Sequence, residues 1–182
     1  MGRYTSEKSE FDELAKKFFE LRGYRAELLG GGLADVAAWN PKSGQFAIVE
    51  VKSPSERDAD INYRYKEENY DLCGKPRKEV WEVVTRQGFA PGEQGIARLV
   101  AFTVSNQLYT YWWRAEKHIQ KFRQKTAANV SPSCLEAFLV LPAEYEPIAK
   151  RIIASFREIP VPRVTRHGKI SVFEISYPSP IS

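Results

Sequence analysis

Two carboxylates and one ammonium group lie close enough in this sequence to form a single reactive centre. Glu50 and Lys52 are separated by one residue at the end of an apolar run, and Asp35 follows three consecutive glycines. If the apolar run is a β-strand, Glu50 and Lys52 share one of its faces, roughly 6–7 Å apart along the chain. If Asp35 lies on the neighbouring strand, a register that places it opposite Glu50 or Lys52 gathers all three charges in one small space.

This set of charges predicts a metal-binding catalytic site that acts on a phosphate. Three charges at the end of a buried hairpin are unfavourable without partners, and a divalent cation relieves the conflict between the carboxylates. Oxygen ligands without Cys or His suit Mg²⁺ or Mn²⁺. Such an ion polarises a phosphoryl oxygen and lowers the pKa of bound water. Lys52 would then orient the attacking water or stabilise the charge that develops on the phosphate.

The same residues also have an ordinary structural explanation. Glu-Val-Lys is a common tripeptide, and an acid near a base is usually a solvated pair that adds little stability. The glycine-rich approach, the Asp at the start of one strand and the Glu-x-Lys at the end of the next are jointly much rarer. Together they favour the catalytic interpretation.

A helix and three strands are expected to position these residues. Ser9 can cap a helix that runs to about Arg22, because apolar residues recur there at helical spacing. Strands are expected at 24–29, 33–39 and 45–52, and strong turn chemistry at 40–44 makes the last two a hairpin. Both hairpin strands are apolar on both faces, so we expect them inside a sheet that is covered on both sides.

The rest of the chain reads as mixed helices and strands. Helices are expected at 61–72, at 78–86, from the end of the strand at 108–113 through residue 122, and at 144–156. Strands are expected at 97–104, 108–113, 135–141 and 169–177. This order predicts an α/β (α+β) fold. The length of 182 residues suits one domain, with a core at about 9–104 and an elaboration at about 105–182.

Residues 31–40 and 46–54, with the helix before them, resemble the PD-(D/E)xK nuclease superfamily, and more narrowly its VRR-Nuc branch. The resemblance covers roughly residues 9–66. It implies a restriction-endonuclease-like core of order α-β-β-β-α-β, in which helices lie on both faces of a central mixed sheet. Two positions depart from the VRR-Nuc pattern: Ala34 stands where a Pro usually precedes the Asp, and Asn62 stands where a Gln is usual.

The resemblance also implies roles for individual residues. Asp35 and Glu50 would bind Mg²⁺ or Mn²⁺ together with the main-chain carbonyl of Val51, and Lys52 would assist the attacking water. Asp12 stands where the superfamily has an acid in its first helix, and would bind a second metal. Equally, Ser9-Glu10-Phe11-Asp12 resembles a capping box, so Asp12 has two explanations. Contacts with nucleic acid are expected from Ser53, Arg57, Asn62, Arg64 and Lys66.

DNA is the expected substrate, and the activity is that of a Mg²⁺-dependent deoxyribonuclease. The net charge of +4 and pI near 9.0 permit a polyanionic partner without requiring one. Small enzymes of this kind often pair, so a homodimer is expected. The role would lie in DNA repair or recombination, in restriction, or in phage and mobile-element processing. The alternatives are a non-catalytic nucleic-acid-binding domain, an RNase, or a nuclease subunit of a larger complex.

Other classes of site are disfavoured by the composition. Cys73 and Cys134 are far apart and the two histidines are isolated, which argues against a disulfide scaffold and a zinc site. No signal peptide or transmembrane segment is recognisable, so we expect a cytoplasmic protein with no membrane partner and no small-molecule cofactor. The basic, aromatic run from Trp112 to Lys125 could track a phosphate backbone, although a solvated helix face is commoner.

Overall fold

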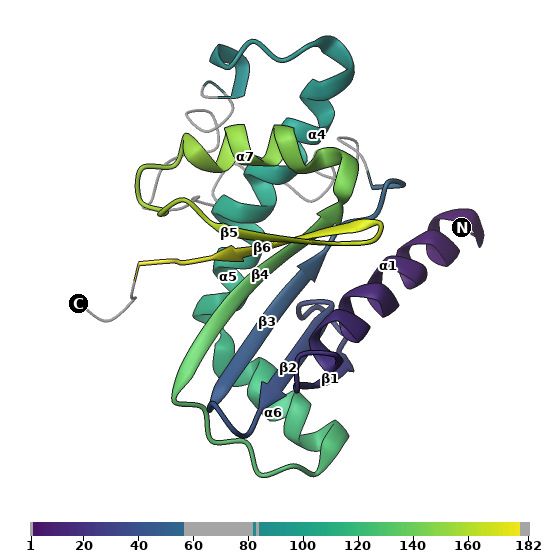
Figure 1. The fold of residues 1–182 in the computed structure, drawn as a ribbon, viewed down its shortest axis with the longest axis vertical. Helices are drawn as coiled ribbons and strands as arrows, with labels where there is room; N and C mark the ends of the chain where they lie inside the picture. The colour runs from purple at the N-terminus through teal and green to yellow at the C-terminus, as the bar shows by residue number, and fades with distance from the viewer. Residues whose placement is uncertain (1, 57–81, 83, 179–182) are drawn as a thin grey trace.

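The computed structural model describes residues 2–56, 82 and 84–178, and its strands form one mixed sheet (Figure 1). The strand order is β1-β2-β3-β4-β6-β5. Strands β3 and β4 run parallel, and the other neighbours are antiparallel. The strands are β1 (Arg25–Leu28), β2 (Val36–Asn40), β3 (Gln45–Val51), β4 (Cys134–Pro142), β5 (Arg163–His167) and β6 (Ile170–Ile175).

Helices cover both faces of this sheet. Helix α1 (Gly2–Glu20) packs on one face. The opposite face is covered by α4 (Pro91–Phe102), the π-helical η2 (Thr103–Gln107), α5 (Leu108–Trp113), α6 (Ala115–Thr126) and α7 (Glu146–Ala154), which the short 3₁₀ turn η3 (Ala143–Tyr145) precedes. None of the described helices combines the length and the apolar composition that crossing a membrane requires.

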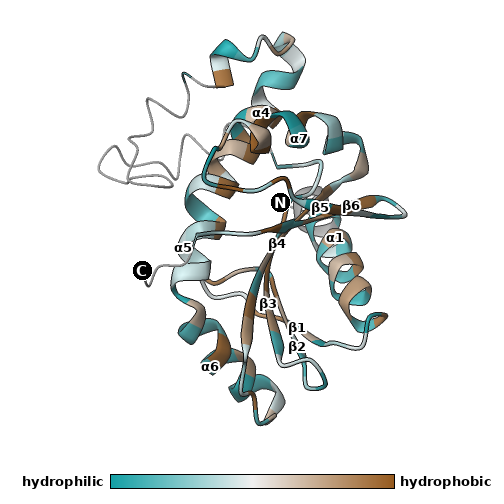
Figure 2. Cartoon of the chain, turned by 60° about the vertical axis from the view of Figure 1, so that its left-hand side comes forward, coloured by the Kyte–Doolittle hydropathy of each residue, from teal (hydrophilic) through white to brown (hydrophobic). Residues whose placement is uncertain are grey.

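Two hydrophobic layers hold the sheet between these helices. On the α1 side, Phe19 is fully buried and its ring meets that of Phe138 edge to face at 4.9 Å. On the other side, the rings of Phe46 and Phe122 meet at 5.6 Å. Burial of each such ring is worth about 1.5–3 kcal/mol. Figure 2 shows hydrophobic residues along the central strands and mixed character on α6, as a helix with one buried face requires.

The expected α/β (α+β) fold class is confirmed, including helices on both faces of a mixed sheet. The predicted hairpin is confirmed as well. Strands β2 and β3 pair from Val36 opposite Val49 to Asn40 opposite Gln45, and all residues of β3 except Gln45 are buried. The alternation of side chains divides these buried residues between the two layers.

Two predicted strands are wrong. Residues 97–104 belong to α4 and η2, and residues 108–113 form α5. A short apolar run fits a buried helix as well as a strand, and here Ala97, Val100, Ala101, Val104 and Leu108 all pack into one core at helical spacing. The strand that follows the helices in the core is therefore β4. Strand β5 was not predicted, because its sequence, Arg-Val-Thr-Arg-His, is polar.

Other predicted boundaries shift. Helix α1 begins at Gly2, so Ser9 lies inside the helix and is not its cap. A division between core and elaboration near residue 104 does not match the sheet, because β4 lies between β3 and β6. The expected helix at 61–72 lies outside the described residues. Within the expected helix at 78–86, residues 82 and 84–86 are helical.

Candidate active site

Asp35, Glu50 and Lys52 lie together at the end of the β2–β3 hairpin. The register pairs Val36 with Val49, and one further step places Asp35 opposite Glu50. The main-chain N–H of Val51 donates to Oδ2 of Asp35 at 2.8 Å, which fixes this carboxylate at the strand end. Opposed residues in an antiparallel pair share a face, so the three charged side chains lie on the same side of the sheet. Of the two registers expected from the sequence, the structure has the one that places Asp35 opposite Glu50.

Lys52 makes ion-pair and hydrogen-bond contacts inside the protein. Its Nζ donates to Oε2 of Glu50 at 3.0 Å and to Oε1 of Gln107 at 2.8 Å, and it lies 3.5 Å from Oε2 of Glu56. The side chain is only 4% exposed. Burial alone would lower the pKa of Lys52, but the two carboxylates outweigh it and raise the pKa. The ammonium form is therefore held in a fixed place.

The two carboxyl groups of the site differ in their preference for a proton. Burial and the negative charge of Asp35 raise the pKa of Glu50 to about 8. Burial also opposes ionisation of Asp35, but nearby Lys8 and hydrogen bonds from Glu50 and the Val51 N–H lower its pKa. Two like charges so close together cannot both be stable without added positive charge. The pair therefore favours one proton or an added cation.

A second lysine, Lys8 of α1, enters the site from the opposite face of the sheet. Its Nζ lies 2.9 Å from Oδ2 of Asp35 and 3.5 Å from Oε1 of Glu56, and it also donates to the main-chain carbonyl oxygen of Val51. Burial would lower the pKa of Lys8, but the neighbouring carboxylates, led by that of Asp35, raise it above its usual value. Lys8 is thus a charged ammonium surrounded by oxygen atoms.

Asp12 lies one helical turn after Lys8. Its Oδ1 is 3.1 Å from Nζ of Lys8, yet this buried oxygen accepts no hydrogen bond of good geometry. Burial and the charge of Asp35 raise the pKa of Asp12 to about 6. The capping explanation for Asp12 is wrong, because α1 begins ten residues earlier, at Gly2. Asp12 instead belongs to the charged cluster, and its metal-binding role stays a prediction.

A cavity of about 250 Å³ opens beside these groups. The glycine-rich loop forms one side through Gly32 and Leu33, and Gln107 and Tyr111 form another. Gly30, Gly31 and Gly32 all have positive φ, a conformation that costs other residues roughly 1–2 kcal/mol each. At roughly 30 Å³ for each water, the cavity holds several waters or a phosphate group.

Three residues of the site were missed by the sequence analysis: Lys8, Glu56 and Gln107. Lys8 and Asp12 have the i, i+4 spacing that joins side chains on one helix face, and this signal could have been found. Glu56 lies in a turn, where it accepts the Ser53 N–H at 3.0 Å. Gln107 ends the π-helical η2, and only the packing of that helix on the sheet brings it to Lys52.

The expected nucleic-acid contacts are largely outside the described residues, where Arg57, Asn62, Arg64 and Lys66 lie. Ser53 is described, and it is buried with its Oγ hydrogen-bonded to Ser55 at 2.7 Å. The basic run on α6 has a core-facing stripe that includes Ile119 and Phe122, with exposed charges on its other side. This arrangement is that of an ordinary helix with one buried and one solvated face, the commoner of the two explanations given for the basic run.

His118 holds the loop that carries Asp35. Its Nε2 accepts the main-chain N–H of Ala34 at 2.9 Å, and its Nδ1 donates to the carbonyl of Arg114 at 3.0 Å. Both ring nitrogens are used by the neutral tautomer, and the residue is fully buried. Burial lowers the pKa of His118 even though the Arg114 carbonyl favours its charged form. His118 thus links α6 to the residue before Asp35.

Because the folded protein disfavours charged His118, acid should weaken the fold. An unfolded histidine takes up its proton near pH 6.5. The stabilisation is therefore present above that pH and is lost as the pH falls through the lower pKa of the folded state. We expect His118→Gln to reduce the decline of unfolding free energy between pH 7 and pH 5, measured by urea titration. His167→Gln, on β5, is the matched control, and an unchanged decline in the His118 variant would contradict the assignment.

The oxygen atoms of the site fit a cation. Among the described residues, no three His, Cys, Asp or Glu side chains are arranged as a ready metal-binding group. However, Oδ2 of Asp35 and the carbonyl oxygen of Val51 both contact one cationic atom, Nζ of Lys8, and Oδ1 of Asp12 lies nearby without a hydrogen bond. A cation with oxygen ligands suits this donor set, which is the chemistry of Mg²⁺ and Mn²⁺.

Comparison with models of protein families, with curated proteins and with solved structures finds no match to this chain. The assignment of a function therefore depends on the geometry of the site and on the resemblance carried by its residues.

Proposed function

We propose that this protein is a Mg²⁺- or Mn²⁺-dependent endonuclease that hydrolyses DNA phosphodiester bonds. The observation that carries the proposal is the convergence of Asp35 Oδ2 and the Val51 carbonyl oxygen on one cationic atom, beside buried Glu50 and Lys52. The resemblance to PD-(D/E)xK nucleases implies the same ligands: two acids and the carbonyl between the second acid and the lysine. The Asp35 carboxylate and the Val51 carbonyl are common to both arguments, while the role of Glu50 rests on the resemblance and on its place beside them.

Each residue would have a distinct part in this reaction. Asp35, Glu50 and the Val51 carbonyl would hold the ion, which when bound supplies charge that polarises the phosphate and lowers the pKa of a water. Lys52, held by Glu50 and Gln107, would orient the attacking water through its ammonium donors. The cavity beside Gly32 and Tyr111 would admit the scissile phosphate. Asp12 is proposed as an additional ligand.

The finer parts of the proposal rest on the resemblance. These are the restriction-endonuclease-like character of the core, action as a homodimer, and a role in DNA repair or recombination, in restriction, or in phage and mobile-element processing. Contacts from Arg57, Asn62, Arg64 and Lys66 to the DNA belong to the same group of proposals. Ser53 has no exposed surface, so it is not among the proposed contacts. A cytoplasmic setting is a further proposal, which does not depend on the resemblance.

A second candidate function is a nucleic-acid-binding domain without catalysis. One observation favours it: Lys8 and Lys52 already supply positive charge to the carboxylates, so the cluster has internal partners. In that case the charges would form a buried ion-pair network that specifies the fold. Metal binding and cleavage distinguish the two candidates.

The test is cleavage of supercoiled, linear, branched and single-stranded DNA, and of RNA, with Mg²⁺, with Mn²⁺ and with EDTA. We expect metal-dependent cutting of DNA, and we expect Asp35→Asn and Glu50→Gln to lower its rate by roughly 10²–10³-fold. Glu10→Gln is the matched control, because this carboxylate is about half exposed and pairs with Lys169. Cutting in EDTA, or full activity in the Glu50 variant, would refute the mechanism.

A further inference from the structure

The ammonium of Lys8 lies among oxygen atoms that include three of the proposed metal ligands, those of Asp35, Asp12 and the Val51 carbonyl. Nζ is 2.9 Å from Oδ2 of Asp35, 3.1 Å from Oδ1 of Asp12 and 3.5 Å from Oε1 of Glu56. It also donates to the Val51 carbonyl oxygen. These oxygens come from α1, from the loop before β2, from the end of β3 and from the following turn. A single cationic atom therefore joins four segments of the chain.

Lys8 reaches this place from outside the sheet. Helix α1 packs on the face opposite to α5, and its N-terminal half extends past the end of β3 (Figure 1). Asp35, Glu50 and Lys52 share the face on which η2 supplies Gln107 and α5 supplies Tyr111. The Lys8 side chain, which is 19% exposed, passes the strand end to contact Asp35. Its position is thus set by the N-terminal half of α1.

Lys8 and a divalent cation would use the same oxygens. Oδ2 of Asp35 already accepts from both Lys8 and the Val51 N–H, and the Val51 carbonyl oxygen accepts from Lys8. An Mg²⁺ ion needs its ligand oxygens at about 2.0–2.1 Å. A monovalent and a divalent cation that share two oxygens would also repel each other strongly in this buried place.

We propose that Lys8 is a tethered cation that occupies the metal position and is displaced when a divalent ion binds. This inference rests on the proposed metal-dependent function. It gives the N-terminal half of α1 a role: its lysine neutralises the carboxylates in the metal-free protein and leaves when metal enters. The free protein is then held in a form that must release Lys8 before it can act.

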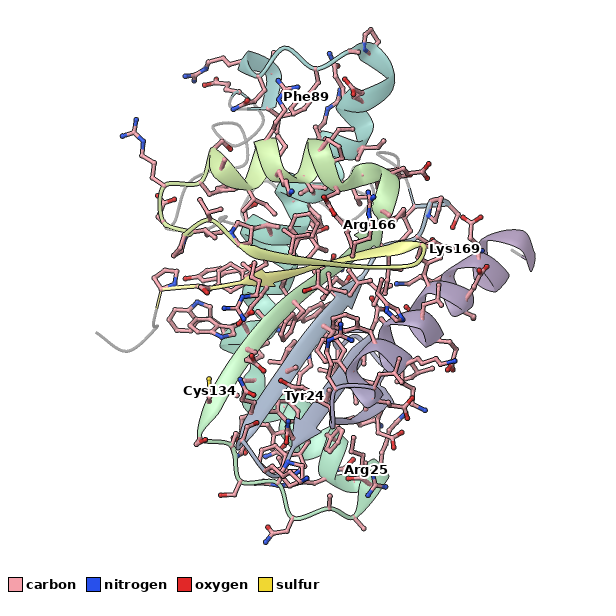
Figure 3. All side chains as sticks on the ribbon, in the orientation of Figure 1. Tyr24, Arg25, Phe89, Cys134, Arg166 and Lys169 are labelled. Carbon is pink, nitrogen blue, oxygen red and sulfur yellow. The ribbon has the colours of Figure 1, made fainter. Side chains whose placement is uncertain are left out.

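Direct metal binding is the first test. The affinity for Mn²⁺, followed by electron paramagnetic resonance or calorimetry, is compared between the wild type and Lys8→Met, which keeps the aliphatic stem. If Lys8 fills the position in nine molecules of ten, its removal raises the affinity about tenfold. Lys169→Met is the matched control. Lys169 lies at the β5–β6 turn beside α1 (Figure 3), where it is exposed and pairs with Glu10 at 2.8 Å. The Lys169→Met substitution removes the same charge as Lys8→Met but leaves the contacts of Asp35 and Val51 unchanged.

The second test follows the amine itself in the wild-type protein, so it does not depend on a variant that folds. An amine-reactive reagent labels exposed lysines, and mass spectrometry reports each site. We expect the labelling of Lys8 to rise several-fold when Mg²⁺ or Mn²⁺ is added, while that of Lys169 stays constant. In Asp35→Asn, which loses a ligand, metal should no longer change the labelling of Lys8.

The outcomes separate the two proposals. Tighter Mn²⁺ binding in Lys8→Met, with metal-dependent labelling of Lys8, supports the tethered cation. Mn²⁺ binding that is no tighter in Lys8→Met than in the wild type, with constant labelling, overturns it and leaves the metal-dependent function standing. If neither protein binds Mn²⁺ or Mg²⁺, the proposed function itself is overturned.

Discussion

Replacing Lys52 by Met is expected to lower the rate of metal-dependent cleavage by roughly 10²–10³-fold. The same change should destabilise the metal-free protein by about 3–5 kcal/mol, the range for a buried ion pair broken on one side. The two effects have one origin. Lys52 is the fixed cation beside Glu50, and its ammonium is the donor that would orient the attacking water.

The destabilisation follows from the surroundings of Lys52. Its Nζ lies 3.0 Å from Glu50 and 3.5 Å from Glu56, and all three side chains are at most 6% exposed. Without the ammonium, these carboxyl groups lose their partner in a place that water does not reach. Burial and the charge of Asp35 raise the pKa of Glu50 to about 8, so this group is already largely protonated at pH 7, and its share of the loss is small, which favours the low end of the range.

Kinetics and unfolding measure the two effects separately. In saturating Mg²⁺, a group that acts in the transition state lowers kcat and leaves KM nearly unchanged. Urea titration in EDTA gives the stability of the metal-free protein. Lys150→Met is the matched control, because Lys150 is 55% exposed and pairs with Glu146 at 3.3 Å. Such exposed pairs contribute about 0–1 kcal/mol. Equal losses of stability in both variants would contradict the buried-pair explanation.

Lys52→Arg separates charge from geometry. The guanidinium keeps the positive charge, but it is planar and larger, and it presents its donors in a fixed fork. We therefore expect Arg to recover part of the stability that Met loses while recovering little of the rate. Full recovery of the rate by Arg would mean that charge alone, and not the position of the ammonium donors, is what the reaction uses.

The hairpin and its three charged residues could be predicted from the sequence for a physical reason. Strand alternation has a period of two, so Glu50 and Lys52 necessarily share a face. The turn at 40–44 left few registers that would keep both strands buried, and the observed pairing of Val36 with Val49 is one of them. These signals are local and depend on neighbouring residues only.

The remaining parts of the site depend on contacts between distant segments. Gln107 reaches Lys52 across 55 positions, and His118 reaches Ala34 across 84. The residues near Gln107 and His118 in the sequence form no pattern that would predict which distant residue each of them contacts. The apolar run at 97–104 was ambiguous in the same way, because only packing against α7 and the sheet decides between helix and strand. Lys8 lay outside the helix that the sequence predicted.

Replacing Glu56 by Gln is expected to destabilise the metal-free protein by about 3 kcal/mol, near the low end of the range for one-sided loss of a buried pair. Among the described residues, Glu56 is the carboxylate that lies within 3.5 Å of both Lys8 and Lys52. Its two oxygens divide between them, Oε1 toward Lys8 and Oε2 toward Lys52. Glutamine keeps the shape and can still accept the Ser53 N–H, so the change isolates the charge.

The matched control is Glu82→Gln. Glu82 pairs with Arg86 at the same i, i+4 spacing that joins Glu56 to Lys52, but it is 49% exposed. Urea titration in EDTA should show that Glu56→Gln lowers the free energy of unfolding by about 3 kcal/mol, while Glu82→Gln lowers it by at most about 0.5 kcal/mol. If metal displaces Lys8, then Mg²⁺ should also reduce the difference in unfolding free energy between wild type and Glu56→Gln, because Lys8, one of the two cations that pair with Glu56, is no longer beside it. A gap that widens in Mg²⁺ would instead mean that the ion itself depends on the charge of Glu56, which would make this residue a ligand.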